Sequence, residues 1–184
     1  MDGSLGDTSV DAMVVEQCQE LMRYGNCDYV TTGNGMELFI EAYTTPPTLV
    51  LMGGGHISLA LSKLAAPLGF RVFVVDDRPE FANPGRFPMA EQTIVVPSYD
   101  RGLEQVPVGT NTFIVIATRG HKYDDMATES AARSRAGYVG LLGSQRKSLL
   151  IYQELFRKGV TEERIREIHS PVGLNIGGRT PEEI

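Results

Sequence analysis

The sequence predicts an α/β fold whose main part is a doubly wound parallel sheet, preceded by a small α+β appendage. Three observations predict it. From residue 48 onward, apolar runs alternate with segments of helical periodicity. Several of these runs are almost wholly apolar, as expected of parallel strands that helices cover on both faces. The first run stops at three consecutive glycines, directly before a helix-like segment.

The predicted appendage covers residues 1–44, and the Thr-Thr-Pro-Pro segment at its end is typical of a linker. Apolar residues recur at helical spacing first, and two strand-like runs follow around a glycine-containing turn. The predicted elements are a helix over residues 10–24 that Asp7 or Thr8 caps and Gly25 ends, and strands 29–32 and 36–43 around a turn at 33–35.

The main domain is predicted over residues 48–184, with strands in the order 3-2-1-4-5. Its elements alternate with the rhythm of βα units. They are strand 49–52, helix 57–68, strand 71–75, strand 93–96, strand 112–117, helix 124–135, strand 137–142, helix 145–157 and a short helix from Thr161 toward His169.

Bulk properties narrow the function classes. The 184-residue chain carries a net charge of −6, whereas a protein that binds a nucleic-acid backbone usually shows a basic stripe. No apolar run approaches the roughly 20 residues of a membrane-spanning helix, and the start lacks the features of a signal peptide. Cys18 and Cys27 form no disulfide framework. We therefore expect a cytoplasmic protein with neither nucleic acid nor membrane as partner.

The three glycines suggest a phosphate-binding turn. Gly53, Gly54 and Gly55 follow the first strand, and the spacing to Ser58 matches a dinucleotide fingerprint in which serine replaces the third glycine. Backbone N–H groups at a helix N-terminus suit an anion. The alternative is a strand-to-helix turn that needs glycine for geometry only. The frame of strand, turn and helix favours a Rossmann-like domain.

Acidic residues close the second strand. Asp76 lies 21 residues after Gly55, near the spacing of an acid that contacts a ribose hydroxyl. Asp77 and Arg78 follow, and the arginine either neutralises the aspartates or contacts a phosphate. Capping and surface solvation are the alternative for all three.

Two of the three histidines follow neighbouring predicted strands. His56 comes directly after the glycines, and Thr118-Arg119-Gly120-His121 comes after the fourth strand. Because these strands are adjacent at the topological switch point, we expect both histidines in one crevice. The favoured interpretation is that they and Arg119 donate hydrogen bonds to an anionic ligand. A zinc site, general acid–base chemistry and purely structural histidines stay open as alternatives.

A second candidate anion-binding site follows the fifth strand. Gly143 and Ser144 precede a predicted helix that Ser144 can cap. Arg146 and Lys147 in its first turn oppose the helix dipole, a cost that a bound anion would relieve. An exposed basic pair is the alternative.

Eight separated blocks, all in one order, together resemble the XdhC/CoxI family of accessory proteins for xanthine dehydrogenase and related molybdenum hydroxylases. They run from about residue 37 to the end of the chain. The blocks are Gly53-Gly-Gly-His56, Asp76–Ala82, Arg86–Pro88, Thr118–His121, Gly140–Ser144, Arg146-Lys147, His169–Leu174 and Thr180–Glu183.

The resemblance implies a Rossmann-like domain that binds molybdenum cofactor, as molybdopterin or its dinucleotide form, and assists its sulfuration and insertion into a hydroxylase such as xanthine dehydrogenase. A cysteine desulfurase is an implied further partner. Arg86 is expected to close over the site from the long loop after the second strand. Longer relatives carry a glycine-rich segment that ends in cysteine, which this chain lacks, and they continue beyond Ile184.

Two other functions remain open. One is an oxidoreductase that uses NAD(P) in the glycine turn, and the other is an interaction module with a vestigial crevice. We expect Cys18 to pack as an apolar side chain on a helix. Cys27, predicted in a turn, is the better candidate for a thiol that approaches a metal. An edge strand of the hairpin could support a homodimer. No residue is assigned a catalytic role.

Overall fold

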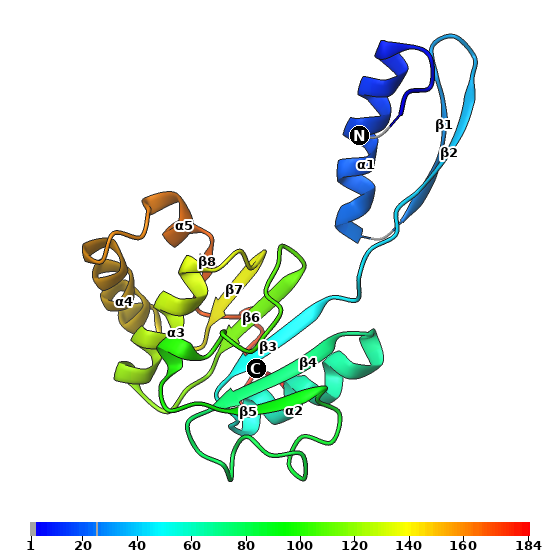
Figure 1. The fold of residues 1–184 in the computed structure, drawn as a ribbon. Coiled ribbons are helices and arrows are strands. Elements are labelled where there is room, and N and C mark those ends of the chain that lie inside the picture. Colours follow the sequence, from blue (N-terminus) through cyan, green and yellow to red (C-terminus); the bar gives the residue numbers. More distant parts are fainter. Residues whose placement is uncertain (1–2, 25) are drawn as a thin grey trace. The chain divides into compact units, whose positions relative to one another are not determined.

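The computed structural model describes residues 3–24 and 26–184 (Figure 1). The chain divides into two compact units, Met1–Thr45 and Pro46–Ile184. Among the described helices, none is long and apolar enough to cross a membrane.

The first unit contains helix α1 (Thr8–Tyr24) and an antiparallel hairpin of β1 (Cys27–Thr31) and β2 (Glu37–Glu41). Asp7 caps α1, because its Oδ1 accepts a hydrogen bond of 2.8 Å from Ser9 N. The predicted helix end at Gly25 falls outside the described residues. Cys27 begins β1 and is exposed, so its predicted place in a turn is wrong; Cys18 is half-buried on α1.

The second unit is built on a six-stranded parallel sheet ordered β5-β4-β3-β6-β7-β8. The predicted doubly wound order is thus confirmed, with β8 added at one edge. The elements are β3 (Thr48–Met52), α2 (His56–Ala65), β4 (Arg71–Asp76), β5 (Gln92–Val95), β6 (Thr112–Ile116), α3 (His121–Arg133), β7 (Tyr138–Leu141), α4 (Gln145–Arg157), α5 (Glu162–Arg166) and β8 (Ile168–His169), with 3₁₀ turns at Ala66–Leu68 and Tyr99–Arg101.

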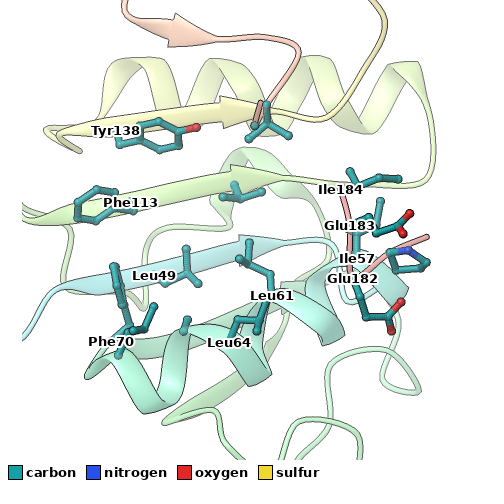
Figure 2. A pocket seen from close by; sticks show the side chains of 16 residues that line it. Leu49, Ile57, Leu61, Leu64, Phe70, Phe113, Tyr138, Glu182, Glu183 and Ile184 are labelled. Atoms are coloured by element: carbon teal, nitrogen blue, oxygen red, sulfur yellow. The ribbon is translucent and has the colours of Figure 1, made fainter. Parts of the chain in front are cut away.

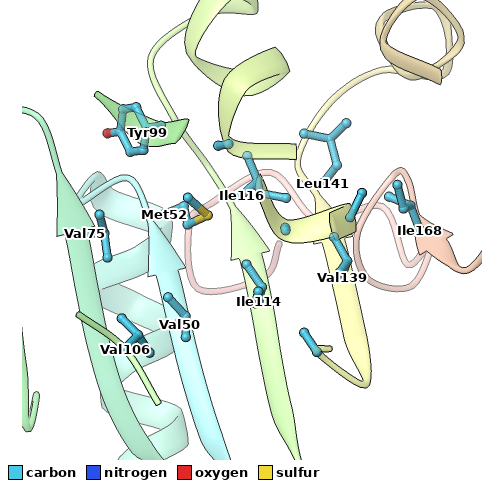
Figure 3. Packing of buried hydrophobic residues seen from close by; sticks show 14 of the residues in the cluster. Val50, Met52, Val75, Tyr99, Val106, Ile114, Ile116, Val139, Leu141 and Ile168 are labelled. Carbon is cyan, nitrogen blue, oxygen red and sulfur yellow. The ribbon is translucent and has the colours of Figure 1, made fainter. Parts of the chain in front are cut away.

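Each face of the sheet has its own hydrophobic cluster. On one face, alternate strand residues such as Val50, Ile114 and Leu141 pack against α3, α4 and α5 (Figure 3). On the other face, Leu51 and Val74 pack with Ala65 of α2. Because α2 and α3 cover opposite faces, the loops before them diverge from the carboxyl edge of the sheet, which is where a doubly wound fold holds its ligand.

Helix boundaries differ from the predictions at the end of α2 and at the start of α3, and the second difference concerns the site. The α-helical part of α2 ends at Ala65, before a 3₁₀ turn with Pro67 near its start, because proline lacks an N–H for the helix to continue. Helix α3 begins at His121 instead of residue 124, so His121 is the first helical residue and not part of a loop.

Candidate functional site

The predicted glycine turn joins β3 to α2, and its three glycines have different roles. Gly53 has φ +107°, and a Cβ there would lie 2.3 Å from the carbonyl oxygen of Ala117. A Cβ on Gly54 would lie 2.2 Å from the carbonyl oxygen of Phe81. Both positions therefore require glycine for the fold itself. A Cβ on Gly55 would meet no atom within 4 Å, so this glycine borders open space.

Gly54 is held from two sides by hydrogen bonds. Its N–H donates to Asp76 Oδ2 at 2.8 Å, and its carbonyl accepts from Arg86 Nε at 2.9 Å. Arg86 thus reaches the turn from the long loop after β4, as expected from its place in the sequence. Its Nη2 atom is buried and has no hydrogen-bond partner among the described residues. The two hydrogen bonds of Gly54 fix the backbone that leads into α2.

Groups of the protein itself bond the Asp76 carboxylate, which the sequence spacing placed near a ribose hydroxyl. Its side chain is fully buried. Oδ1 accepts from Arg78 N and Nε, both at 3.0 Å, and Oδ2 accepts from Gly54 N and from Arg78 Nη2 at 3.2 Å. Burial acts to raise the pKa of Asp76, but the hydrogen bonds from Arg78 and Gly54 N outweigh it and hold the pKa below its ordinary value. A carboxylate engaged in this way positions the glycine turn and offers no free oxygen to a ribose.

Asp77 and Arg119 form an ion pair across the switch point. Asp77 follows β4 and Arg119 follows β6, so the pair spans the end of β3, which lies between these strands. Arg119 Nη2 lies 2.7 Å from Asp77 Oδ2 and donates to Tyr123 Oη at 3.2 Å. Asp77 Oδ1 is buried without a hydrogen-bond partner in the described part of the chain, whereas 44% of the Arg119 side chain stays exposed.

The N-termini of α2 and α3 have the same kind of cap. We call these two strand-to-helix connections the open junctions (residues 53–56 and 117–121). Gly55 caps α2 and Gly120 caps α3, and neither helix receives a side-chain hydrogen bond at its cap. A Cβ on Gly120, like one on Gly55, would meet no atom within 4 Å. Their parent strands β3 and β6 pair directly. Two helix N-termini therefore follow neighbouring strands. Each carries the positive end of its helix dipole and has open space beside its cap residue.

The N-terminus of α4 differs, and we call it the closed junction (residues 142–147). Ser144 caps the helix by accepting from Lys147 N at 3.4 Å, which confirms the predicted cap. Lys147 Nζ forms an ion pair with the buried Asp124 of α3, whose other oxygen accepts from Thr118 Oγ1 at 2.7 Å. Gly143 packs tightly here, because a Cβ would lie 3.0 Å from Lys147 Cδ. The ion pair between Lys147 and Asp124 thus joins α4 to α3, and Thr118 holds the other oxygen of Asp124.

The remaining predicted residues are exposed. Arg146 lies at the surface and forms no ion pair with any described residue. His56 and His121 are exposed first residues of α2 and α3. His121 also lines a hollow of about 440 Å³ with Asp125 and Glu154, between α3 and α4. Among the described residues, no group of three or more His, Cys, Asp or Glu side chains could hold a metal ion.

The sequence did not identify three residues that hold the charged side chains at the carboxyl edge of the sheet in place. Phe81 stacks on Arg78, whose guanidinium carbon lies 3.6 Å from the ring centroid. Tyr123 stacks under Arg119 at 4.9 Å. Asp124 is the buried partner of Lys147. In the sequence, Asp124 only marked the start of a predicted helix, and no pattern there connected it to Lys147.

A separate cavity of about 470 Å³ lies on the α2 face of the sheet (Figure 2). Leu49, Leu61, Phe70, Phe113 and Tyr138 line it. The charged side chains at its wall are Glu182 and Glu183, and no described Lys, Arg or His lines it. It is therefore unsuited to an anion.

The comparisons with known proteins identify the family. Residues 49–184 match the XdhC Rossmann domain, which is most of the chain. This chain belongs to the XdhC Rossmann-domain family. The resemblance deduced from the eight sequence blocks is thereby confirmed, as is the Rossmann-like fold.

Two curated relatives are much longer than this chain. It is 38% identical over 152 residues to "Uncharacterized protein YqeB" of Escherichia coli K12, covering 83% of the chain and 28% of that protein. It is 31% identical over 147 residues to a probable xanthine dehydrogenase subunit of Bacillus subtilis 168, covering 80% of the chain and 42% of that protein. The chain thus spans less than half the length of either relative.

A solved structure supports the fold alone. The crystal structure of a xanthine dehydrogenase from Bacillus halodurans superposes with a TM-score of 0.64 at 18% identity. The match covers 96% of this chain and 61% of that chain.

Proposed function

We propose that this chain is an accessory protein of a molybdenum hydroxylase such as xanthine dehydrogenase, and that its open junctions bind molybdenum cofactor as cargo. The family and the name of the Bacillus subtilis relative support the accessory role. The ligand proposal rests on two helix N-termini that follow neighbouring strands, each with glycine as its N-cap residue and no side-chain hydrogen bond at the cap. Sulfuration with a cysteine desulfurase as sulfur donor, and a cytoplasmic location, belong to the same proposal.

The donor set fits the phosphate end of this cofactor, in the molybdopterin or the dinucleotide form. Free N–H groups in the first turns of α2 and α3 favour a dianion, and the absence of a Cβ on Gly55 and Gly120 lets the ligand approach the backbone. Arg119 is half-exposed and can add a charge-assisted hydrogen bond.

Asp77 competes with the ligand for Arg119. In the absence of an anion, the 2.7 Å ion pair holds the guanidinium between the loops after β4 and β6. An entering phosphate offers a second acceptor, so binding exchanges one charged partner for another. Arg86 and Asp76 do not contact the ligand in this proposal, because both hold Gly54.

NAD(P) is the second candidate ligand, since the glycine turn has the dinucleotide spacing. The engagement of both Asp76 oxygens disfavours it, because the usual ribose contact needs one of them free.

Calorimetric titration of the full chain under anaerobic conditions, once with isolated molybdenum cofactor and once with NADPH, tests the proposal. We expect saturable binding of molybdenum cofactor at tens of micromolar or tighter, and weaker or no binding of NADPH. Absence of cofactor binding in this range would refute the ligand proposal, and preference for NADPH would favour the oxidoreductase.

A matched pair of variants locates the site. Gly55→Val adds a branched side chain where a Cβ meets no atom, so the fold should tolerate it while the ligand cannot approach. Gly109→Val adds the same atoms in equally open space before β6, at the opposite edge of the sheet. We expect Gly55→Val to abolish binding and Gly109→Val to preserve it. Equal affinities in both variants would place the ligand elsewhere.

A further inference from the structure

The hairpin of the first unit has one covered face and one uncovered face. Along β1 and β2, half-buried or buried residues alternate with exposed ones. Ile40 on the covered face is buried, as is Val10 of α1, the helix that contacts β2. Tyr29 and Phe39 on the opposite face remain 80% and 52% exposed. Two large aromatic side chains therefore face solvent on the side of the hairpin that α1 does not cover.

The uncovered face is an ordered ladder of three cross-strand pairs, and we call it the aromatic–acidic face (Cys27, Tyr29, Thr31, Glu37, Phe39, Glu41). The central pair is Tyr29 opposite Phe39, with ring centroids 4.9 Å apart. Glu41 lies opposite Cys27 on one side of it, and Glu37 lies opposite Thr31 on the other. Neither glutamate forms an ion pair with a described residue, although Glu41 Oε2 accepts a hydrogen bond of 2.7 Å from Tyr43 Oη. The face thus presents a carboxylate, an aromatic pair and a second carboxylate in line.

Charge sets this unit apart from the rest of the chain. Residues 1–45 contain eight acidic residues and one basic residue, whereas residues 46–184 contain fifteen acidic and sixteen basic residues. The net negative charge of the chain therefore comes from the first unit, since the charges of the second unit nearly cancel. A second copy of the same face would bring two strongly acidic surfaces together, which electrostatic repulsion opposes.

We propose that the aromatic–acidic face is a docking surface for a basic, extended segment of a partner protein. Carboxylates bind arginine or lysine by ion pairing, and the exposed aromatic pair between them offers an apolar contact surface. Glu37 and Glu41 are four residues apart on one strand, or about 13 Å. A segment with the alternation basic–x–apolar–x–basic matches this spacing, with its apolar side chain on the aromatic pair.

This proposal is independent of the cofactor site, since none of its residues belongs to the open junctions. It also departs from the homodimer expected from the hairpin edge, because it requires a partner of opposite charge.

Fluorescence anisotropy with the full chain tests it. The probe is a short, blocked, labelled peptide with the repeat Arg-Thr-Val-Thr, compared with the same peptide carrying Glu in place of Arg and with one carrying Ser in place of Val. We expect binding of the first peptide only, weakening as salt is raised. Phe39→Ser should weaken it about fivefold, and Glu37→Gln with Glu41→Gln about threefold.

Matched controls separate this face from overall charge. Glu16→Gln with Glu20→Gln removes the same charge from exposed positions of α1, and Met22→Ser removes an exposed apolar side chain from the same helix. We expect the peptide to bind both controls as it binds the unchanged chain. The Val10 and Ile40 methyl resonances report whether each variant keeps the unit folded.

Three results would overturn the proposal. One is equal weakening by the α1 controls, which would reduce the effect to net charge. Another is equal binding of the Glu peptide or of the Ser peptide. The third is a dimer in sedimentation that Phe39→Ser dissociates, which would make a second copy the occupant.

Discussion

The open junctions before α2 and α3 differ from the closed junction before α4, although all three join a parallel strand to a helix. At the open junctions glycine caps the helix, no side chain takes the free N–H groups, and the space beside each cap is empty. At the closed junction Ser144 caps the helix and Asp124 neutralises Lys147. The same topology thus yields two helix ends available to an anion and one helix end already satisfied by the protein.

The comparison also separates glycines that contact other loops from glycines that border open space, although the φ of +150° at Gly120 requires glycine as well. Gly53 and Gly54 lie against backbone atoms of other loops, whereas Gly55 and Gly120 border open space. A glycine-rich motif can therefore serve two requirements, close contact with other backbone atoms and open space beside the chain, and the sequence alone does not distinguish them.

The largest expected effect is on Gly53. Gly53→Ala puts a Cβ 2.3 Å from Ala117 O at a φ of +107°, so steric overlap and backbone strain together should lower the free energy of unfolding by about 3 kcal/mol or more. Urea denaturation measures it. Gly55→Ala is the control and should change stability by about 0.5 kcal/mol or less. Similar losses in both variants would contradict the division of roles within the turn.

Asp76→Asn should be the next most damaging change, because it removes the buried charge that pairs with Arg78; we expect a loss of about 3 kcal/mol at pH 7. The pKa of Asp76 is lowered in the folded state from 3.8, so its stabilisation is present above that pH and is lost as the pH falls through the folded pKa. The difference in unfolding free energy between the unchanged chain and Asp76→Asn should therefore narrow below about pH 4. A constant difference from pH 7 to pH 2 would argue against a charge effect.

Lys147→Met should weaken the closed junction without affecting ligand binding. It leaves the Asp124 carboxylate buried without its cation, and because 17% of the Lys147 side chain is exposed we expect a loss of about 2 kcal/mol. Arg146→Met, one residue earlier and fully at the surface, should leave stability unchanged. Thermal unfolding and cofactor titration together check both. A loss of affinity in Lys147→Met at temperatures where it is folded would assign this lysine to the ligand instead.

Arg119→Met should produce the reverse pattern. Affinity for molybdenum cofactor should fall about tenfold, since a charge-assisted hydrogen bond is lost, while stability changes little because the ion pair is half-exposed. Asp77→Asn removes the carboxylate that competes for Arg119 and should strengthen binding about threefold. Opposite shifts in the two variants are the expected signature, and parallel losses would contradict competition.

The sequence predicted which strands and loops surround this site, but it did not predict the contacts between the side chains within it. The apolar runs and the three glycines predicted the strand order and placed the loops after β3 and β6 side by side. They did not predict β8, because two residues at a sheet edge carry no periodic pattern. The early start of α3 was also missed, since Gly120 and His121 give no capping signal of the usual kind.

The roles of Asp76 and Lys147 could not be deduced from spacing. Asp76 stands where a ribose-binding acid is expected, and only the fold shows that Gly54 N and Arg78 occupy its oxygens. Lys147 is adjacent to Arg146 in sequence, yet one is paired with a residue of α3 and the other is exposed. Contacts between elements distant in the chain decide such roles.

The most direct test of the open junctions is the set of backbone amide resonances of the full chain during titration with anaerobically isolated molybdenum cofactor, with inorganic pyrophosphate as a second ligand. We expect the amides of residues 55–57 and 120–122 to shift together and saturably with both ligands, while those of residues 145–147 stay unchanged. Shifts centred on residues 145–147, or none at the glycine-capped ends, would contradict the assignment of the ligand to the open junctions.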